Sequence, residues 1–229
     1  MGSKPTDKRI VCTYVITDDS VATQICYAGR ASQIASIEID GVLQSTISES
    51  YNLSAGTHVI KFGMKVENTI AQYFFSGIGT LTEAYIPDNF TTINRDIFST
   101  CSKLETLRVP TNMTSIPIQF IRDTNISSFE IPQTVTSIGA NAFQGTKITE
   151  ITVPSGVTSI AGGSFRYITS LTTFIILATT PPSNVGNTTF QGSSNMYIYV
   201  PDGYVDTYKS AGGWSGYSSR IKAISELNQ

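Results

Sequence analysis

Residues that commonly carry catalysis are scarce in this chain. It contains one histidine, His58, in the stretch AGTHVI. A catalytic triad or a zinc site would have to be built around that residue, and no HExxH, GxSxG or P-loop pattern occurs. We predict that His58 is an exposed histidine at the start of a strand and that the protein is not an enzyme. A hydrolase using two carboxylates is the remaining catalytic alternative.

Paired aspartates and the cysteines give only weak indications of a metal site or a disulfide. Asp18 with Asp19, and Asp202 with Asp206, could ligate calcium, but we interpret them as turn and helix-cap residues, with Asp202 capping a short helix. The three cysteines form no CxxC pair. Cys12 and Cys26 could form a disulfide if their segments pair; the competing interpretation is three buried thiols. No metal and no cofactor is predicted.

Aromatic and acidic side chains are the better candidates for binding. Tyrosines crowd the C-terminal region around the only tryptophan, and glutamates lie between apolar residues of successive repeats. Aromatic rings stack on sugars and anchor protein partners. The candidate ligand surface therefore comprises Glu83, Glu150, Tyr199, Tyr204, Trp214 and Tyr217. The alternative is that the aromatic residues cap a core and that the glutamates are only solvated.

One phrase recurs along the middle of the chain. VTSIGANAF at 135–143 returns as VTSIAGGSF at 157–165, and shorter forms occur as TTINRDIF at 91–98 and TSIPIQF at 114–120. A second phrase accompanies it: LTEAYIP (81–87), LETLRVP (104–110), ISSFEIP (126–132) and ITEITVP (148–154), with a degenerate copy, LTTFIIL, at 171–177. A unit of 22–23 residues cannot bury its own apolar face, but stacked units can.

Each part of the unit has a structural interpretation. In ITEITVP, Ile151 and Val153 are two residues apart and share one face of a strand. The following proline ends the strand because it has no N–H to donate. The T-S-I segment then returns along a second wall, with its Ile and the later Phe pointing inward.

These repeats resemble the BspA-type leucine-rich repeats of surface proteins from gut and oral bacteria. The resemblance covers residues 78–195, and the tail at 198–224 is similar to the ending of such proteins. It implies a mainly β leucine-rich-repeat solenoid of about five units with a C-terminal cap. It also implies a non-catalytic, monomeric adhesion protein, secreted or held on the cell surface as a lipoprotein, that binds host or bacterial surface proteins. A carbohydrate-recognition module of a polysaccharide-uptake system is the alternative, and it requires Trp214 to be exposed.

Residues 9–75 lack the repeat. They form short alternating segments with a turn dipeptide at Asp40-Gly41, and YNLSAGTHVIKFGMK resembles a hairpin. We predict a leader or linker at 1–8, a small β-sandwich at 9–75, the solenoid at 78–195 and a strand–helix cap at 196–229, with a helix over 203–211.

Composition limits the partners. Only 14% of the residues are charged, and the formal net charge is −2. The basic patch of a nucleic-acid-binding protein is missing, and no apolar run reaches the roughly 18 residues of a membrane span. The start of the chain lacks an apolar signal-peptide segment, so we expect any signal or anchor to have been removed. Partners are predicted to be proteins or glycans.

Overall fold

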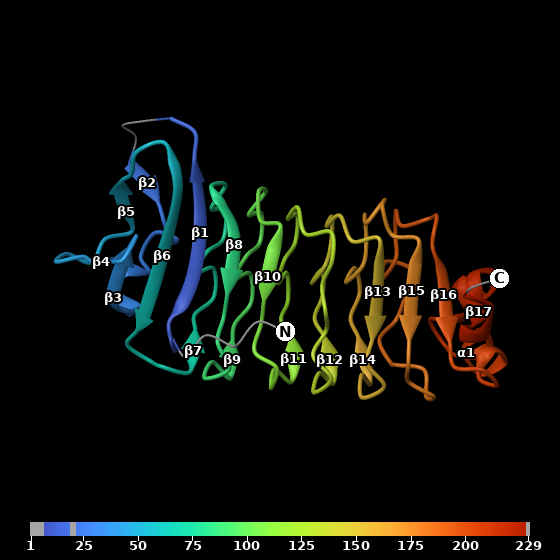
Figure 1. Ribbon diagram of the computed structural model, residues 1–229. Helices are drawn as coiled ribbons and strands as arrows, with labels where there is room; N and C mark the ends of the chain where they lie inside the picture. The colour runs from blue at the N-terminus through green and yellow to red at the C-terminus, as the bar shows by residue number, and fades with distance from the viewer. Residues whose placement is uncertain (1–6, 19–21, 228–229) are drawn as a thin grey trace.

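The computed structural model describes residues 7–18 and 22–227. Most of the expected leader, residues 1–6, and the candidate ligand Asp19 lie outside the described residues. The chain forms a row of stacked rungs between an N-terminal sheet and a C-terminal cap (Figure 1). About seven turns of roughly 23 residues span 69–223, so the mainly β solenoid is confirmed and is longer than five units.

Most rungs contribute a strand to a first wall, here called the strand wall. Its parallel strands are β8 (Leu81–Tyr85), β10 (Thr106–Arg108), β13 (Glu150–Val153), β15 (Thr173–Ile176), β16 (Tyr197–Val200) and β17 (Ile221–Ala223). A second wall holds two-residue strands: β7 (Thr69–Ile70), β9 (Thr92–Ile93), β11 (Ser115–Ile116), β12 (Ser137–Ile138) and β14 (Ser159–Ile160). The pairing of β7 with β9 shows that the stack begins at Thr69, inside the segment predicted as the β-sandwich.

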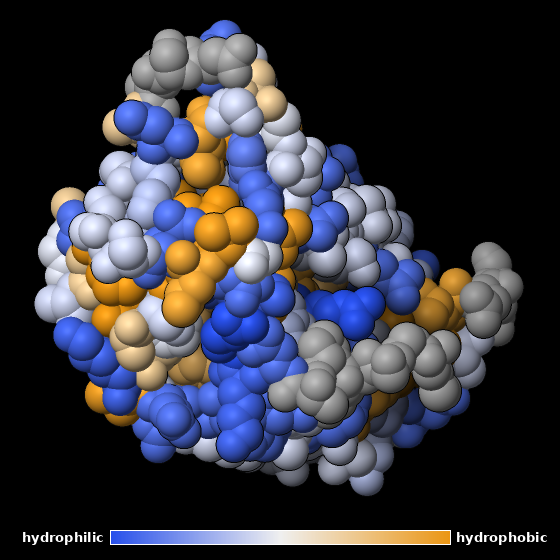
Figure 2. Space-filling model, turned by 60° about the vertical axis from the view of Figure 1, so that its left-hand side comes forward, coloured by the Kyte–Doolittle hydropathy of each residue, from blue (hydrophilic) through white to orange (hydrophobic). Residues whose placement is uncertain are grey.

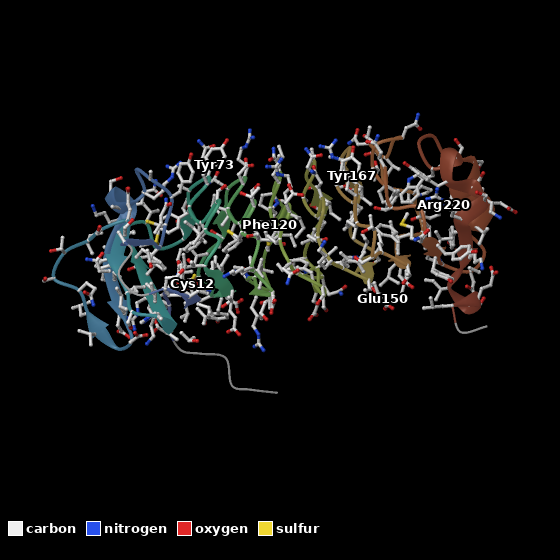
Figure 3. All side chains as sticks on the ribbon, turned by 90° about the horizontal axis from the view of Figure 1, so that it is seen from above. Cys12, Tyr73, Phe120, Glu150, Tyr167 and Arg220 are labelled. Atoms are coloured by element: carbon white, nitrogen blue, oxygen red, sulfur yellow. The ribbon has the colours of Figure 1, made fainter. Side chains whose placement is uncertain are left out.

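A column of phenylalanines fills the space between the walls. Phe75 and Phe98 stack with centroids 5.3 Å apart, and Phe143 and Phe165 stack at 5.1 Å. Figure 3 shows Phe120 in the middle of the molecule, with Tyr73 and Tyr167 toward one long side and Glu150 toward the other. The predicted inward direction of the repeated Phe residues is confirmed, because all of them are fully buried.

The threonine of the T-S-I segment links one rung to the next. The hydroxyl of Thr158 donates to the carbonyl of Thr136 at 3.3 Å, and the hydroxyl of Thr136 donates to the carbonyl of Thr114 at 3.2 Å. The same residues are joined by backbone N–H to C=O bonds of 2.9 Å. A hydroxyl at this position therefore adds a side-chain bond to the ladder, which explains why the phrase keeps Thr as well as Ile.

Among the described residues of 9–75, no separate sandwich forms. The strands here are β1 (Ile10–Ile16), β2 (Ala22–Gln24), β3 (Ile34–Ile39), β4 (Val42–Leu43), β5 (Ser50–Asn52) and β6 (Gly56–Met64), with a 3-10 turn at Ala31–Gln33. One sheet has the order β10-β8-β1-β6-β3-β4, so β1 pairs antiparallel with the repeat strand β8. The structure differs from the expected docked module because the repeat wall continues directly into the antiparallel sheet.

Of the two turns predicted in this region, the turn at Asp40-Gly41 is confirmed and the hairpin around Ser54 is not. Asp40 and Gly41 both have positive φ, 51° and 84°, as a tight hairpin turn between β3 and β4 requires. The hairpin expected around Ser54 is wrong, because β5 pairs with β2 whereas β6 pairs with β1 and β3. Neighbouring strands in the chain have joined different sheets.

The outermost strand of the antiparallel sheet is apolar and uncovered. Figure 2 shows apolar side chains gathered on this end of the molecule. Val42 and Leu43 of β4 are both about two-thirds exposed, at 64% and 66%, and Val59 of β6 is partly exposed. The edge of the sheet at this end is therefore exposed, although Phe62 and Phe74 cover Phe75 at the start of the phenylalanine column.

The C-terminal end is closed by α1 (Val205–Ser210) and the 3-10 segments Ser215–Arg220 and Ile224–Glu226. The helix is shorter than the expected 203–211. Asp202 does not cap it: the cap residue is Tyr204, and an Asp202 carboxylate oxygen accepts a hydrogen bond from the Ser225 N–H at 3.1 Å. The prediction of Asp202 as a helix cap is wrong because that carboxylate ties β16 to the final turn instead.

Candidate strand-wall binding surface

The strand wall presents outward side chains in register from rung to rung. Thr106 is opposite Glu83 in the first sheet, and Glu150, Thr173 and Tyr197 follow one another in the second. Residues two apart along each strand face the same way, so a second row contains Arg108 and Thr152. The result is a broad polar surface with a charged or hydroxyl side chain on nearly every rung.

The wall is interrupted at the third copy of the repeat. ISSFEIP was aligned with the strand phrase, but the structure has no strand over 126–132. Figure 1 shows the corresponding absence of an arrow between β10 and β13. The ring of Phe129 packs between Phe120 and Phe143, at 6.2 and 5.4 Å, where other rungs have ring-to-ring contact. Phe174 occupies the equivalent position of β15, between Phe165 and Phe190, and β15 still pairs with β13 and β16, so the ring alone does not prevent pairing.

A groove lies beside the interruption. It has a volume of about 400 Å³ and runs between residues 127–133 and 149–152. Its lining includes the hydroxyls of Ser127, Ser128 and Thr149 and the carboxylates of Glu130 and Glu150. The sequence also indicates that Glu130 faces outward, but the predicted ligand surface included only Glu150 among these residues; the adjacent serines at 127–128, in place of Thr-Glu in the next copy, were the available signal.

Three further members of the candidate surface differ in how far they are exposed. Glu83 is exposed on β8, where the Thr13 hydroxyl donates to it at 3.4 Å. Tyr199 is almost buried, whereas its neighbour Tyr197 is exposed and carries the Lys222 ammonium 4.0 Å from its ring centroid. Tyr204 is 39% exposed at the start of α1, away from Glu83 and Glu150.

Trp214 does not lie on the surface, so its inclusion among the ligand-binding residues is wrong. Its side chain is 0% exposed, and its indole N–H donates to the Pro182 carbonyl at 2.9 Å. Tyr217 is also buried, with its hydroxyl donating to the Gly186 carbonyl at 2.8 Å. Both rings contact the end of the phenylalanine column through Phe190. The cap uses these aromatic residues as core, which removes the stacking platform that the carbohydrate alternative requires.

The described residues contain no group of three or more His, Cys, Asp or Glu side chains that could hold a metal ion. The three cysteines are buried free thiols, so the Cys12–Cys26 disulfide is absent. Burial raises the pKa of the Cys101 thiol to about 12, and its S–H donates to the Phe75 carbonyl. These thiols act as small core residues.

The imidazole of His58 is held from both sides. Its Nδ1 is 2.7 Å from a carboxylate oxygen of Asp40, and its Nε2 is 3.0 Å from the Ser54 carbonyl. Both partners only accept hydrogen bonds, and both ring nitrogens donate only in the imidazolium form. The hydrogen bond to Asp40, followed by that to Ser54, raises the pKa of His58 above its ordinary value. The predicted position at a strand start is correct, but the side chain is only 12% exposed.

We expect His58 to make the stability of the protein depend on pH. Because its folded-state pKa is raised, its stabilising contribution is complete below the unfolded value of 6.5 and is lost as pH rises through the folded-state pKa. Melting temperatures of wild type and His58→Gln, measured between pH 6 and 9, should converge at the alkaline end. NMR titration of the only imidazole gives the pKa of His58 directly. A value at or below 6.5 would contradict the stabilisation of the imidazolium by Asp40 and Ser54.

Residues 68–197 match the description BspA type leucine rich repeat region, in six copies. This match covers more than half of the 229 residues. The chain belongs to the BspA-type leucine-rich repeat family. The first copy begins at residue 68, ten residues before the predicted start, in agreement with the pairing of β7. No protein with a curated description matches the sequence.

Solved structures of bacterial leucine-rich repeat proteins resemble this BspA-type chain. A protein from Bacteroides ovatus ATCC 8483 is 22% identical, covering 69% of this chain and 45% of that one, with a TM-score of 0.48. The T. pallidum leucine rich repeat protein is 20% identical, covering 58% and 62%, with a TM-score of 0.50. A leucine rich cell surface protein from Faecalibacterium prausnitzii A2-165 is 17% identical, covering 58% and 63%, with a TM-score of 0.32.

These likenesses concern architecture. At 20% identity, the T. pallidum structure supports the fold of the BspA-type chain and nothing about its ligand. This chain spans between 45% and 63% of the length of the three matched proteins. Within the described residues, no helix is both long and apolar enough to cross a membrane.

Proposed function

We propose that this chain is a non-catalytic binding protein of a bacterial cell surface, and that its strand wall binds proteins of a host or of other bacteria. The observation that carries the proposal is the in-register series of outward side chains on consecutive rungs, including Glu83, Thr106, Glu150 and Tyr197. A stacked repeat offers such a surface without a closed cavity, which suits a macromolecular partner. Membership of the BspA-type family supports the surface location.

The test is a binding screen of the purified chain against immobilised extracellular-matrix proteins and glycans. The expected result is saturable binding to a protein, which the double variant Glu83→Lys/Tyr197→Ser weakens. These two residues lie on the strand wall outside the groove. The matched control is Tyr167→Ala, since Tyr167 is 49% exposed on the other long side of the molecule (Figure 3).

Two outcomes would contradict the proposal. One is binding that Tyr167→Ala abolishes and the strand-wall variant retains, which would move the interaction to the opposite side. The other is binding confined to glycans, which would favour the carbohydrate-recognition function.

A further inference from the structure

The groove at the interrupted rung has an open sheet edge. Among the described residues, the backbone of 127–131 forms no backbone hydrogen bond. β13 lies at the edge of its sheet and pairs only with β15, whereas β10 is the edge of the other sheet. Elsewhere in the strand wall each rung is bonded to the next, so this is a local break in a continuous ladder.

The peptide groups that face the groove can be assigned from the pairing of β13. The Val153 carbonyl accepts from the Leu177 N–H at 3.0 Å, on the β15 side. In a parallel ladder, successive residues direct their N–H and C=O groups alternately to the two sides. The peptide groups of Val153 and Ile151 therefore face β15, and those of Glu150 and Thr152 face the groove. An added strand would find donors and acceptors there in the usual parallel or antiparallel spacing.

Both ends of the open edge are defined. The Lys147 N–H donates to the Ile126 carbonyl at 2.8 Å before the groove, and the Thr158 N–H donates to the Thr136 carbonyl at 2.9 Å beyond it. Between these links the two rungs share no backbone bond within the described part of the chain. An extended segment of about five or six residues, at roughly 3.3 Å per residue, is long enough to cross this edge.

The side chains of the groove favour a basic segment. Glu130 and Glu150 are both exposed, and neither forms an ion pair within 4.0 Å among the described residues. The only aromatic ring of the lining, Phe129, is buried, so no face is available for stacking on a sugar. Hydroxyls of serine and threonine complete the lining.

We propose that this groove binds an extended basic peptide segment of a protein partner, which adds a strand to the open edge of β13 and directs a Lys or Arg side chain toward Glu130 and Glu150. Main-chain hydrogen bonds would supply affinity, and the carboxylates would select charge, as in other cases of strand addition. The proposal rests on the proposed binding function, because it names the partner chemistry of one part of the same wall.

The first probe is a capped hexapeptide of alternating Val and Lys, titrated into the isotopically labelled chain. We expect saturable NMR shifts confined to residues 127–133 and 149–152. The same peptide with alternate backbone amides N-methylated keeps its charges but cannot pair as a strand, and we expect it not to bind. Equal binding of the methylated peptide would overturn the proposal, because attraction between charges alone would then explain the shifts. Shifts elsewhere, or none, would also overturn it.

The second arm changes the protein. Glu130→Gln/Glu150→Gln keeps side-chain size and removes both charges, and we expect it to weaken hexapeptide binding at least about fivefold. Glu67→Gln is the matched control, because Glu67 is an exposed glutamate outside both the groove and the strand wall, and it should leave affinity unchanged. Unchanged binding in the double variant would overturn the assigned role of the two carboxylates.

The two proposals can fail separately. If the screen finds a protein ligand that the Glu130→Gln/Glu150→Gln variant binds normally and the hexapeptide does not bind, the groove proposal fails and the surface-binding function stands. If the hexapeptide binds in the groove but no surface protein binds, the groove stands and the adhesion function fails.

Discussion

Phe143→Ala is expected to lower the free energy of unfolding by about 3–5 kcal/mol, the usual cost of truncating a buried phenylalanine. Phe143 is fully buried, stacks on Phe165 at 5.1 Å and contacts Phe129 at 5.4 Å. Its removal leaves a cavity in the middle of the column, where the backbone of Phe143 itself is held by the bond from its N–H to the Ser164 carbonyl at 2.9 Å. For a chain of this size the melting temperature should fall by roughly 6–20 °C.

The control for this experiment lies on the adjacent wall. Glu150→Ala removes an exposed side chain of β13 and should change stability by no more than about 0.5 kcal/mol. Urea unfolding followed by circular dichroism measures both variants. Small and equal losses would show that the VTSIGANAF segment does not direct its phenylalanine into the core. A variant in which only half of the signal is lost in the first transition would show that the cavity uncouples the two halves of the stack.

The repeated core was predictable because periodicity reports burial directly. Ile138 and Phe143 recur with the period of the stack, and each copy must present the same apolar positions to its neighbours. The position of the first rung was harder to find, since TIAQYFF at 69–75 keeps the Ile and the Phe but lacks the preceding strand phrase. The pairing of Thr69 and Ile70 with β9 identifies it, and the family match that begins at residue 68 agrees.

Pairing between strands was less predictable than the pattern within them. ISSFEIP has the apolar alternation of a strand, but alternation within a segment does not state whether its backbone pairs with its neighbours: LTTFIIL, with Phe174 at the same position, forms β15 and pairs on both sides. The same limit applies to β5 and β6, which are adjacent in sequence and joined by turn residues, yet belong to different sheets. For β5 and β6, pairing with strands distant in sequence decides the outcome.

Among the candidate binding residues, those in regular strands were predictable and the aromatic residues after β16 were not. Glu83 and Glu150 face outward as their strand positions predict, because alternation fixes the side of a residue in a regular strand. For the aromatic residues after β16 there is no such rule, since a turn or short helix can direct a ring either way. Trp214 is buried because its indole N–H meets the carbonyl of Pro182, 32 residues earlier.

Trp214→Ala should be comparably destabilising, with an expected loss of about 3–5 kcal/mol. The ring is fully buried, meets Tyr208 edge-on at 5.0 Å and approaches Phe190 at 6.4 Å, so it closes the end of the phenylalanine column. Its removal also leaves the Pro182 carbonyl without its hydrogen bond. Trp214→Phe keeps an aromatic ring but loses the hydrogen bond, so it should lower the stability less than Trp214→Ala does. The difference between the two variants separates the contribution of ring packing from that of the hydrogen bond.

Because Trp214 is the only tryptophan, its fluorescence reports on the cap alone. We expect iodide to quench the folded protein far less than the urea-unfolded chain. Efficient quenching in the folded state, together with an unchanged melting temperature for Trp214→Ala, would return this residue to the ligand surface and revive the carbohydrate-recognition alternative. Protection from iodide, together with a large loss of stability in Trp214→Ala, would instead show that the strand wall depends on the cap. Among the described residues no further rung follows β17. Without the aromatic residues that cover it, the phenylalanine column that ends at Phe190 would be open to water.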